Sequence, residues 1–288
     1  MSIDHAFLSL EELDKLLKED VPYFDLTTFV LGIGPQAGQI TFASREKIVL
    51  CGTEEVCRLL QKYNVTIQHS LASGSLVMPG TTFLEAEGLA QNLHLVWKVC
   101  QNIFEYTSGI ATRTRTLVDL AKDVNPAISV VTTRKVFPGT KALAVKAVLA
   151  GGAMPHRLGL SETVLIFPNH LAFLGGLEGF LQLITEVKQK CQEKKICVEV
   201  ESLEDARQAL KAGVEIIQFD KLDKIELEKA VEELKSLDER VQIAAAGGIN
   251  QANVQAFAAT GVDILVTTAP YFGLPADIAV KIQAGPKT

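Results

Sequence analysis

Two pairs of basic residues stand where strands or turns are expected to end in an apolar part of the chain. Arg134 and Lys135 follow a run of β-branched residues, and His156 and Arg157 follow a Gly-Gly turn. Any one of them alone could be a solvated surface cation. Burying cationic stems is costly unless an anion meets them, and guanidinium groups hold carboxylates or phosphates at two points. The four residues together predict a site for an anionic small molecule.

Acidic residues follow the next predicted strands. Glu199 and Glu201 are two apart, so their side chains share one face of a strand, and Asp220 ends the strand after it. Two like charges on one face require a cation. Mg²⁺ prefers a few carboxylates together with substrate oxygens, so a metal that carries a phosphorylated substrate is one interpretation.

The alternative for Glu199 and Glu201 is a structural ion network. Its cations would be drawn from Lys135, Lys141 and Lys146. We expect Lys141 and Lys146 to lie on a helix surface.

The run AAAGGIN places Gly247 and Gly248 between a buried strand and a helix that Asn250 would cap. Glycine lets a backbone approach a ligand closely, and the amides of a helix start suit phosphate. A lone Gly-Gly could also make only a tight turn. Thr267 and Thr268 end the last predicted strand, so we include them in the predicted phosphate site.

The elements that would position these residues alternate between strand and helix. Strand-like runs are found at Ile128–Thr132, Val164–Phe167, Ile196–Val200, Val214–Phe219, Val241–Ala245 and Asp263–Val266. Helical patterns separate them at 174–192, 203–211, 225–237 and 251–259. This order is typical of βα units on a parallel sheet, so we predict a six-stranded incomplete barrel or an open sheet.

The first hundred residues have a different, α+β pattern with antiparallel strands. A helix begins after Ser9 with the capping-box residue Glu12, and strands are expected at 38–52 and 65–87 around a helix at 53–63. A long helical pattern follows at 92–122, which Gly109 could interrupt.

Composition excludes several classes of protein. The 288 residues carry a net charge of −6 and are 48% hydrophobic, which argues against nucleic-acid binding and disorder. The five cysteines form no CxxC pair, as expected of buried, reduced thiols. We find no signal peptide and no apolar run of the length that spans a bilayer. The cytoplasm is therefore the expected location.

Several motifs together resemble the quinolinate (nicotinate-nucleotide) phosphoribosyltransferase family. They are EDVPYFDLTT, EYTSGIAT, TTRKVFPGTK, AGGAMPHRLGLSETVLIFPNH, VEVESLEDA and AAAGGIN, which cover nearly the whole chain. Their form is similar to the ModD branch, pyrophosphorylases associated with molybdenum transport. The resemblance implies an α/β sandwich over residues 1–108, a barrel-like domain over 109–270, and residues 271–288 packing back on the first. It also implies a homodimer with a shared active site, with further assembly left open.

The resemblance also implies a role for each site residue. Arg134, His156 and Arg157 would hold the carboxylates of an aromatic base, with Phe167 and Glu201 also lining its site. Lys135, Glu199 and Asp220 would be catalytic: the lysine near pyrophosphate, the acids at the ribose of phosphoribosyl pyrophosphate and its Mg²⁺. Gly247 and Gly248 would bind the 5′-phosphate. Lys98 stands where the family has an arginine that reaches across the dimer.

The chain departs from the family pattern at the base site. Phe167 replaces a lysine, Pro168 an aspartate, and Ala246 the serine of SGG; Lys221 and Thr268 replace an asparagine and a glycine. Losing that lysine, having Lys98 in place of an arginine and lining the pocket with Phe167 removes positive potential that a dicarboxylate needs. We therefore expect a less anionic aromatic base than quinolinate.

Two other functions remain open from the sequence. The chain could still use quinolinate and form nicotinate mononucleotide. It could also be a non-catalytic anion-binding protein of molybdenum handling.

Overall fold

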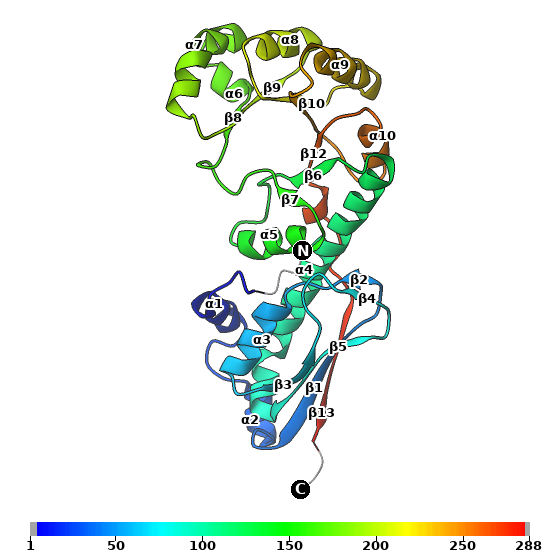
Figure 1. Ribbon diagram of the computed structural model, residues 1–288. Coiled ribbons are helices and arrows are strands. Elements are labelled where there is room, and N and C mark those ends of the chain that lie inside the picture. Colours follow the sequence, from blue (N-terminus) through cyan, green and yellow to red (C-terminus); the bar gives the residue numbers. More distant parts are fainter. Residues whose placement is uncertain (1–4, 286–288) are drawn as a thin grey trace. The chain divides into compact units, whose positions relative to one another are not determined.

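A computed structural model describes residues 5–285, which form two compact units (Figure 1). The first unit contains the described residues up to Arg115, then Val136–Gly152 and the described residues from Pro270 onward. The second contains Thr116–Lys135 and Ala153–Ala269. The division into 1–108 and 109–270, with 271–288 packing back, stays a prediction, and its residues 1–4 and 286–288 lie outside the described part.

The first unit is built on an antiparallel sheet of four strands. The strand order is β13 (Ile278–Ala284), β1 (Ala37–Ser44), β5 (Thr82–Leu89) and β3 (Thr66–Ser70), beside a small pair of β2 (Ile48–Val49) and β4 (Leu76–Val77). Its helices are α1 (Leu10–Asp20), α2 (Leu26–Leu31), α3 (Thr53–Lys62), α5 (Lys141–Ala150) and most of α4 (Ala90–Val124). The capping box expected of Ser9 and Glu12 is present at α1. The antiparallel α+β pattern is confirmed.

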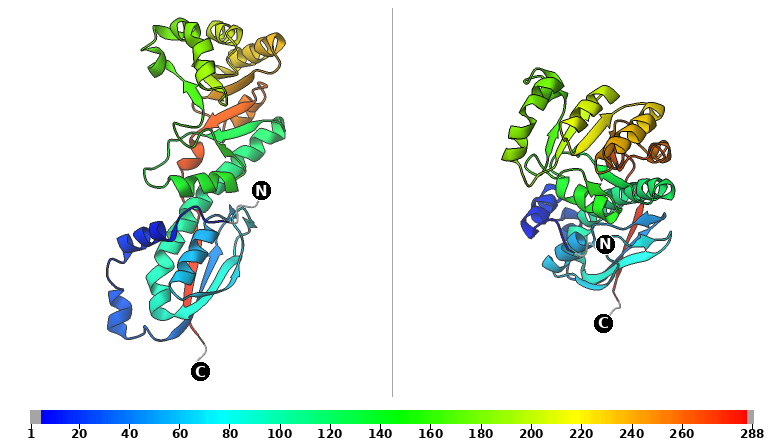
Figure 2. Two further views of the ribbon diagram at one scale, coloured as in Figure 1. Left: turned by 60° about the vertical axis from the view of Figure 1, so that its left-hand side comes forward. Right: turned by 45° about the horizontal axis from the view of Figure 1, so that its top comes forward.

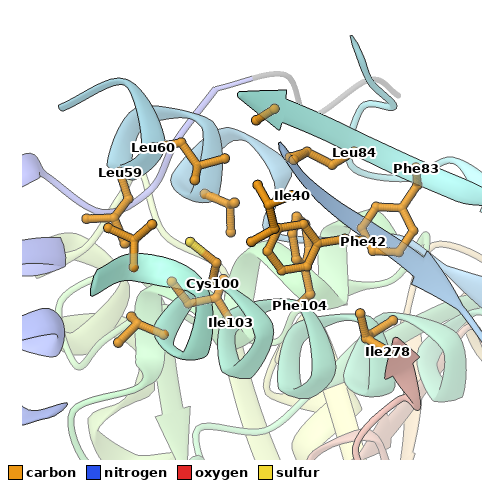
Figure 3. Close-up of a cluster of buried hydrophobic side chains, with 14 of the residues drawn as sticks. Ile40, Phe42, Leu59, Leu60, Phe83, Leu84, Cys100, Ile103, Phe104 and Ile278 are labelled. Carbon is orange, nitrogen blue, oxygen red and sulfur yellow. The ribbon is translucent and has the colours of Figure 1, made fainter. Parts of the chain in front are cut away.

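The core of this unit lies between the sheet and helices α3 and α4 (Figure 3). Burial alternates along β1, so Ile40 and Phe42 point into the core. Phe104 of α4 makes edge contacts with Phe42 and Phe83, with ring centroids 5.3 and 5.0 Å apart. Such aromatic pairs add to the free energy gained by burying apolar area.

The expected break of α4 at Gly109 is wrong, because the helix runs without interruption from Ala90 to Val124. A Cβ at Gly109 would lie 3.0 Å from the carbonyl oxygen of Leu274 and 3.1 Å from the amide nitrogen of Ala276. The Ala276 N–H donates to the Glu105 carbonyl at 2.8 Å. The glycine therefore allows a neighbouring chain segment to approach the helix closely.

The expectation that Lys146 lies on a helix surface is also wrong. Its side chain is fully buried, and its Nζ lies 2.7 Å from Glu54 Oε2 and 2.5 Å from Glu55 Oε2. It also donates to the His5 carbonyl at 3.1 Å. A buried ammonium needs such paired and hydrogen-bonded surroundings. Its acidic partners are therefore residues of α3, not Glu199 or Glu201.

The second unit is built on an open parallel sheet of seven strands. The order is β7 (Met154–Pro155), β6 (Ser129–Thr132), β12 (Ile264–Thr267), β11 (Gln242–Ala246), β10 (Ile216–Asp220), β9 (Ile196–Val200) and β8 (Val164–Ile166). All six expected strands are present, and the curled half-barrel α/β fold is confirmed. The sequence missed β7 because two residues at a sheet edge carry no periodic pattern.

Helices cover one face of this sheet. They are α6 (Pro168–Leu171), α7 (Gly176–Lys190), α8 (Leu203–Lys211), α9 (Lys224–Leu237) and α10 (Val254–Ala258), and a 3-10 turn follows at Ala269–Tyr271. Figures 1 and 2 show α7, α8 and α9 along one side of β8, β9 and β10. Side chains alternate along each strand, so Val198, Val200, Ile217 and Phe219 are buried toward the helices. We call the opposite face the inner face. Within residues 5–285, no helix combines the length and apolarity needed to cross a bilayer.

Replacing Lys146 with methionine should destabilise the first unit. The substitution leaves the carboxylates of Glu54 and Glu55 buried without their cation, which costs about 3–5 kcal/mol of unfolding free energy. Urea unfolding measures the loss. Lys47→Met, at an exposed lysine of the same unit, should change the free energy by less than about 0.5 kcal/mol. Equal midpoints for the two variants would contradict the structural importance of the ion cluster.

Candidate functional site

The register of the parallel strands gathers polar residues on the inner face. Glu199 of β9 pairs with Gln218 of β10, and Gln218 with Ala244 of β11. One layer further along, Asp220 pairs with Ala246. Paired residues of parallel strands point to the same face, so Asp220 lies beside Ala246, and Gln218 stands between Glu199 and Ala244. The register therefore places Glu199, Gln218 and Asp220 together on the inner face.

Negative charge on this face is only partly compensated. Burial raises the pKa of the Glu199 carboxyl, a hydrogen bond from Gln218 opposes that shift, and the charges of Asp220 and Glu201 raise the pKa further. Glu199 and Asp220 are half-buried, whereas Glu201 is exposed. Lys221 is a cation beside these acids, and its Nζ lies 3.4 Å from Asp220 Oδ2. A cation or a developing positive charge would therefore be stabilised here.

Gln218 is a site residue that the sequence reasoning missed. It is buried, its Nε2 donates to Glu199 Oε2 at 2.8 Å, and its Oε1 has no partner among the described residues. The available signal was a glutamine inside the apolar run IIQF. A buried amide oxygen without a hydrogen-bond partner lowers the stability of the fold. Its presence here indicates that Gln218 serves to orient Glu199.

The charge of Arg157 acts on Cys197 of β9, as does that of Glu199. Burial lowers the pKa of Arg157, and so does the charge of Arg134. Burial raises the pKa of the Cys197 thiol to about 12; the charge of Glu199 raises it too, and that of Arg157 lowers it. Cys197, two residues before Glu199 on the same face, is thus within electrostatic range of both. Arg134, Arg157 and Glu199 all belong to the second unit, and a direct contact between the arginines and Glu199 stays a prediction.

Two further residues of the basic group are placed differently. The amide of His156 donates to the Thr132 carbonyl at 2.9 Å, and burial, followed by the charge of Arg157, lowers the pKa of its imidazole below 6.5. His156 is therefore neutral at pH 7 and adds hydrogen-bonding capacity but no charge. Lys135 is exposed, and its amide donates to Thr133 Oγ1 at 3.3 Å.

Phe167 lies between a guanidinium and an imidazole. The Cζ of Arg157 is 5.9 Å from the Phe167 ring centroid, and the His170 ring centroid is 4.4 Å away. The Phe167 N–H donates to His170 Nδ1 at 3.3 Å. Because Phe167 follows β8 directly, this aromatic group stands at the edge of the sheet beside β9.

The Gly247-Gly248 turn follows β11, beside Asp220. Both glycines have left-handed backbones, with φ of 95° and 72°. A Cβ at Gly247 would lie 2.4 Å from Lys221 Cγ and 2.8 Å from Asp220 Oδ1, whereas one at Gly248 would meet nothing within 4 Å. Gly247 is therefore required by close packing, and Gly248 leaves the turn open to a ligand.

The expected helix cap at Asn250 is wrong, because α10 begins at Val254 and Asn253 is the residue before it. Asn250 instead stabilises the turn: its Oδ1 accepts from the Ala252 N–H at 2.9 Å, and its Nδ2 donates to the Gly248 carbonyl at 3.0 Å.

The two threonines at the end of β12, Thr267 and Thr268, have different surroundings. Thr267 is buried and donates its hydroxyl to the Ile249 carbonyl at 2.6 Å, so it braces the glycine turn. Thr268 Oγ1 lies 2.9 Å from Thr133 Oγ1 at the ends of the neighbouring strands β12 and β6. A direct phosphate contact by either threonine stays a prediction.

Lys98 belongs to α4 of the first unit, whereas all other predicted site residues belong to the second. Its Nζ lies 4.1 Å from the centroid of the Trp97 ring and donates to Gln101 Oε1 at 2.8 Å. Its expected role across a dimer stays a prediction.

The part of the chain that the structure describes contains no group of three or more His, Cys, Asp or Glu side chains arranged to hold a metal ion. A Mg²⁺ ion can take one or two carboxylates from the protein and its other oxygens from substrate and water, so its expected binding by Glu199 and Asp220 stays a prediction.

Known proteins share this architecture over nearly their whole length. NadC from Streptococcus pyogenes has a TM-score of 0.87 and 26% identity, covering 95% of this chain and 96% of that one. The nicotinate-nucleotide pyrophosphorylase from Ehrlichia chaffeensis has the same TM-score and identity, covering 96% and 99%.

Sequence comparison agrees with the structural one. Family models described as the N- and C-terminal domains of quinolinate phosphoribosyl transferase match residues 25–108 and 110–281. Relatives named as pyrophosphorylases of the ModD type are 37% identical in Pasteurella multocida, covering 96% of this chain and 98% of that protein, and 41% identical in Rhodobacter capsulatus, covering 83% and 91%. The chain therefore belongs to the quinolinate phosphoribosyltransferase family.

Proposed function

We propose that this phosphoribosyltransferase moves the phosphoribosyl group of phosphoribosyl pyrophosphate to an aromatic nitrogen base other than quinolinate. The new bond joins a ring nitrogen to the anomeric carbon, and the bond from that carbon to pyrophosphate breaks, so pyrophosphate leaves with the electron pair. Family membership supports the reaction class, and the arrangement of the inner face supports the role that we assign to each of its residues.

The inner-face residues suit the charges of this reaction. The carboxylates of Glu199 and Asp220 would stabilise positive charge that develops at the anomeric carbon. Lys135 would stabilise the departing pyrophosphate, and Gly247 and Gly248 would hold the 5′-phosphate with backbone amides. When bound through Glu199 and Asp220, Mg²⁺ would neutralise charge on the pyrophosphate.

The base preference rests on one observation, the aromatic group around Phe167. An aromatic ring contacting Arg157 and His170 offers a surface for stacking. With His156 neutral at pH 7, Arg134 and Arg157 are the positive charges of this group. Such a site favours an aromatic base with fewer carboxylates than quinolinate.

Quinolinate itself is the second candidate acceptor. The proximity of Arg134 and Arg157, which suits carboxylate binding, favours it. Relatives with 29% and 32% identity are named carboxylating nicotinate-nucleotide pyrophosphorylases, in Methanothermobacter thermautotrophicus and Archaeoglobus fulgidus.

We also propose a homodimer with a shared active site. Large apolar side chains in and before α2 support it: Tyr23, Phe29, Val30 and Leu31 are 92%, 73%, 71% and 64% exposed. A cluster of this kind is typical of a protein–protein contact. A cytoplasmic location rests on the five free cysteines, and a link to molybdenum transport or metabolism rests only on the ModD resemblance.

The direct test is pyrophosphate release. The protein is incubated with phosphoribosyl pyrophosphate, Mg²⁺ and a panel of aromatic bases that includes quinolinate. The proposal expects release with at least one base and faster release with it than with quinolinate. Faster release with quinolinate would favour the second candidate. Tight donor binding without turnover by any base would instead identify a non-catalytic anion-binding protein.

Gln218→Met should lower kcat/KM about tenfold, because a hydrogen bond to a charged carboxylate is worth about 1.5–3 kcal/mol. The variant keeps the side-chain volume but removes the donor to Glu199. Glu199→Gln should lose about 100-fold or more, as expected when an electrostatic group is removed. The matched control is Gln242→Met, which should retain wild-type kinetics. Gln242 begins the neighbouring strand β11, at the end away from the glycine turn. A wild-type rate for Gln218→Met would show that Glu199 needs no such orientation.

Phe167→Lys should raise the affinity for quinolinate about tenfold, because a charge-assisted contact to a carboxylate replaces an aromatic surface. It should also weaken binding of the preferred base. Calorimetric titration with quinolinate and with the preferred base measures both affinities. Leu237→Lys adds the same charge at the exposed end of α9 and should change neither affinity. If the two variants behave alike, Phe167 does not set base preference.

A further inference from the structure

Lys221 has a backbone conformation that lysine rarely adopts. Its φ is +62°, and among residues 5–285 the only other non-glycine residue with positive φ is Asn64. Asparagine tolerates this region, whereas a long side chain pays a steric cost there. A lysine at this position therefore needs an explanation beyond turn geometry.

The surroundings fix this backbone against the glycine turn. The Lys221 N–H donates to the Ala246 carbonyl at 2.8 Å. The aliphatic stem lies so close to Gly247 that an added Cβ there would be 2.4 Å from Lys221 Cγ. The lysine and the turn are thus fitted to each other, and the stem passes beside the predicted phosphate site.

The ion pair between Lys221 and Asp220 does not offset the steric cost of the left-handed backbone. The Lys221 Nζ lies 3.4 Å from Asp220 Oδ2, and its side chain is 78% exposed. Ion pairs of such exposure stabilise a protein very little. The ammonium is instead a mobile charge that can leave Asp220 for another anion.

The charges around Lys221 indicate which group its ammonium could bind. Glu199 of β9 and Asp220 of β10 lie on the inner face, and Glu201 follows β9. The charges of Asp220 and Glu201 act on Glu199, and the charge of Lys221 opposes them. A phosphoryl group at the open side of Gly248 would add negative charge beside these three carboxylates. A cation within reach of both groups would remove much of that repulsion.

We infer that Lys221 is a substrate-binding residue whose ammonium contacts a phosphoryl oxygen of the donor at the Gly247-Gly248 turn. The inference rests on the proposed function, because it assumes that the donor is phosphoribosyl pyrophosphate. Lysine suits this task as a compact point charge on a flexible stem.

Calorimetric titration of phosphoribosyl pyrophosphate in the presence of Mg²⁺ tests the assignment. Lys221→Met keeps the stem and removes the charge, so donor affinity should fall about tenfold or more. Lys221→Arg should stay within about threefold of wild type, because it keeps the charge. The matched control is Lys224→Met, three residues later and exposed, which should bind like wild type.

Lys221→Gly separates binding from folding. Glycine relaxes the left-handed backbone, so the Tm should rise or stay unchanged while donor affinity falls as for methionine. A purely structural lysine would not give these opposite movements.

Two failures are distinguishable. If wild type binds the donor and Lys221→Met binds it equally well, the assignment of Lys221 is overturned while the proposed function stands. If wild type does not bind phosphoribosyl pyrophosphate, the proposed function fails and the Lys221 assignment fails with it.

Discussion

The site depends on the repulsion between two carboxylates, those of Glu199 and Asp220, held on one face of a parallel sheet. The pairing of β9 with β10 fixes Glu199 beside Gln218, and Asp220 follows one layer further along. The buried apolar face under the helices prevents a one-residue slip, because such a slip would turn these acids toward the core. The energy of the apolar core is thus what keeps like charges together, and a polyphosphorylated substrate with its cation would relieve their repulsion.

Around the carboxylates, each neighbouring element supplies what they lack. Gln218 of β10 provides a hydrogen bond, the glycine turn provides open backbone, and the loops after β6 and β7 provide Arg134 and Arg157. This distribution over separate βα units is how parallel α/β folds build sites at the carboxyl ends of their strands. Under the proposed function, this separation would let Phe167 act on the base without disturbing the phosphate end.

Much of the fold could be predicted from sequence because the strands of the second unit are short apolar runs and its helices have clear periodicity. The grouping of Arg134, Arg157 and Glu199 in one unit followed from the rule that ligands bind at strand ends. Lys146 was misjudged because its partners, Glu54 and Glu55, lie about 90 positions away in the chain. Gly109 was misjudged because its role depends on a tertiary contact with residues 274–276. Gln218 and Lys221 were passed over as site residues because a hydrogen bond across strands and a backbone dihedral leave no periodic signal.

The most direct measurement is a crystal structure of the protein with phosphoribosyl pyrophosphate and Mg²⁺. The account predicts the 5′-phosphate at Gly247 and Gly248 and the ribose within contact of Glu199 and Asp220. A donor bound elsewhere, or bound without contact to either carboxylate, would contradict it.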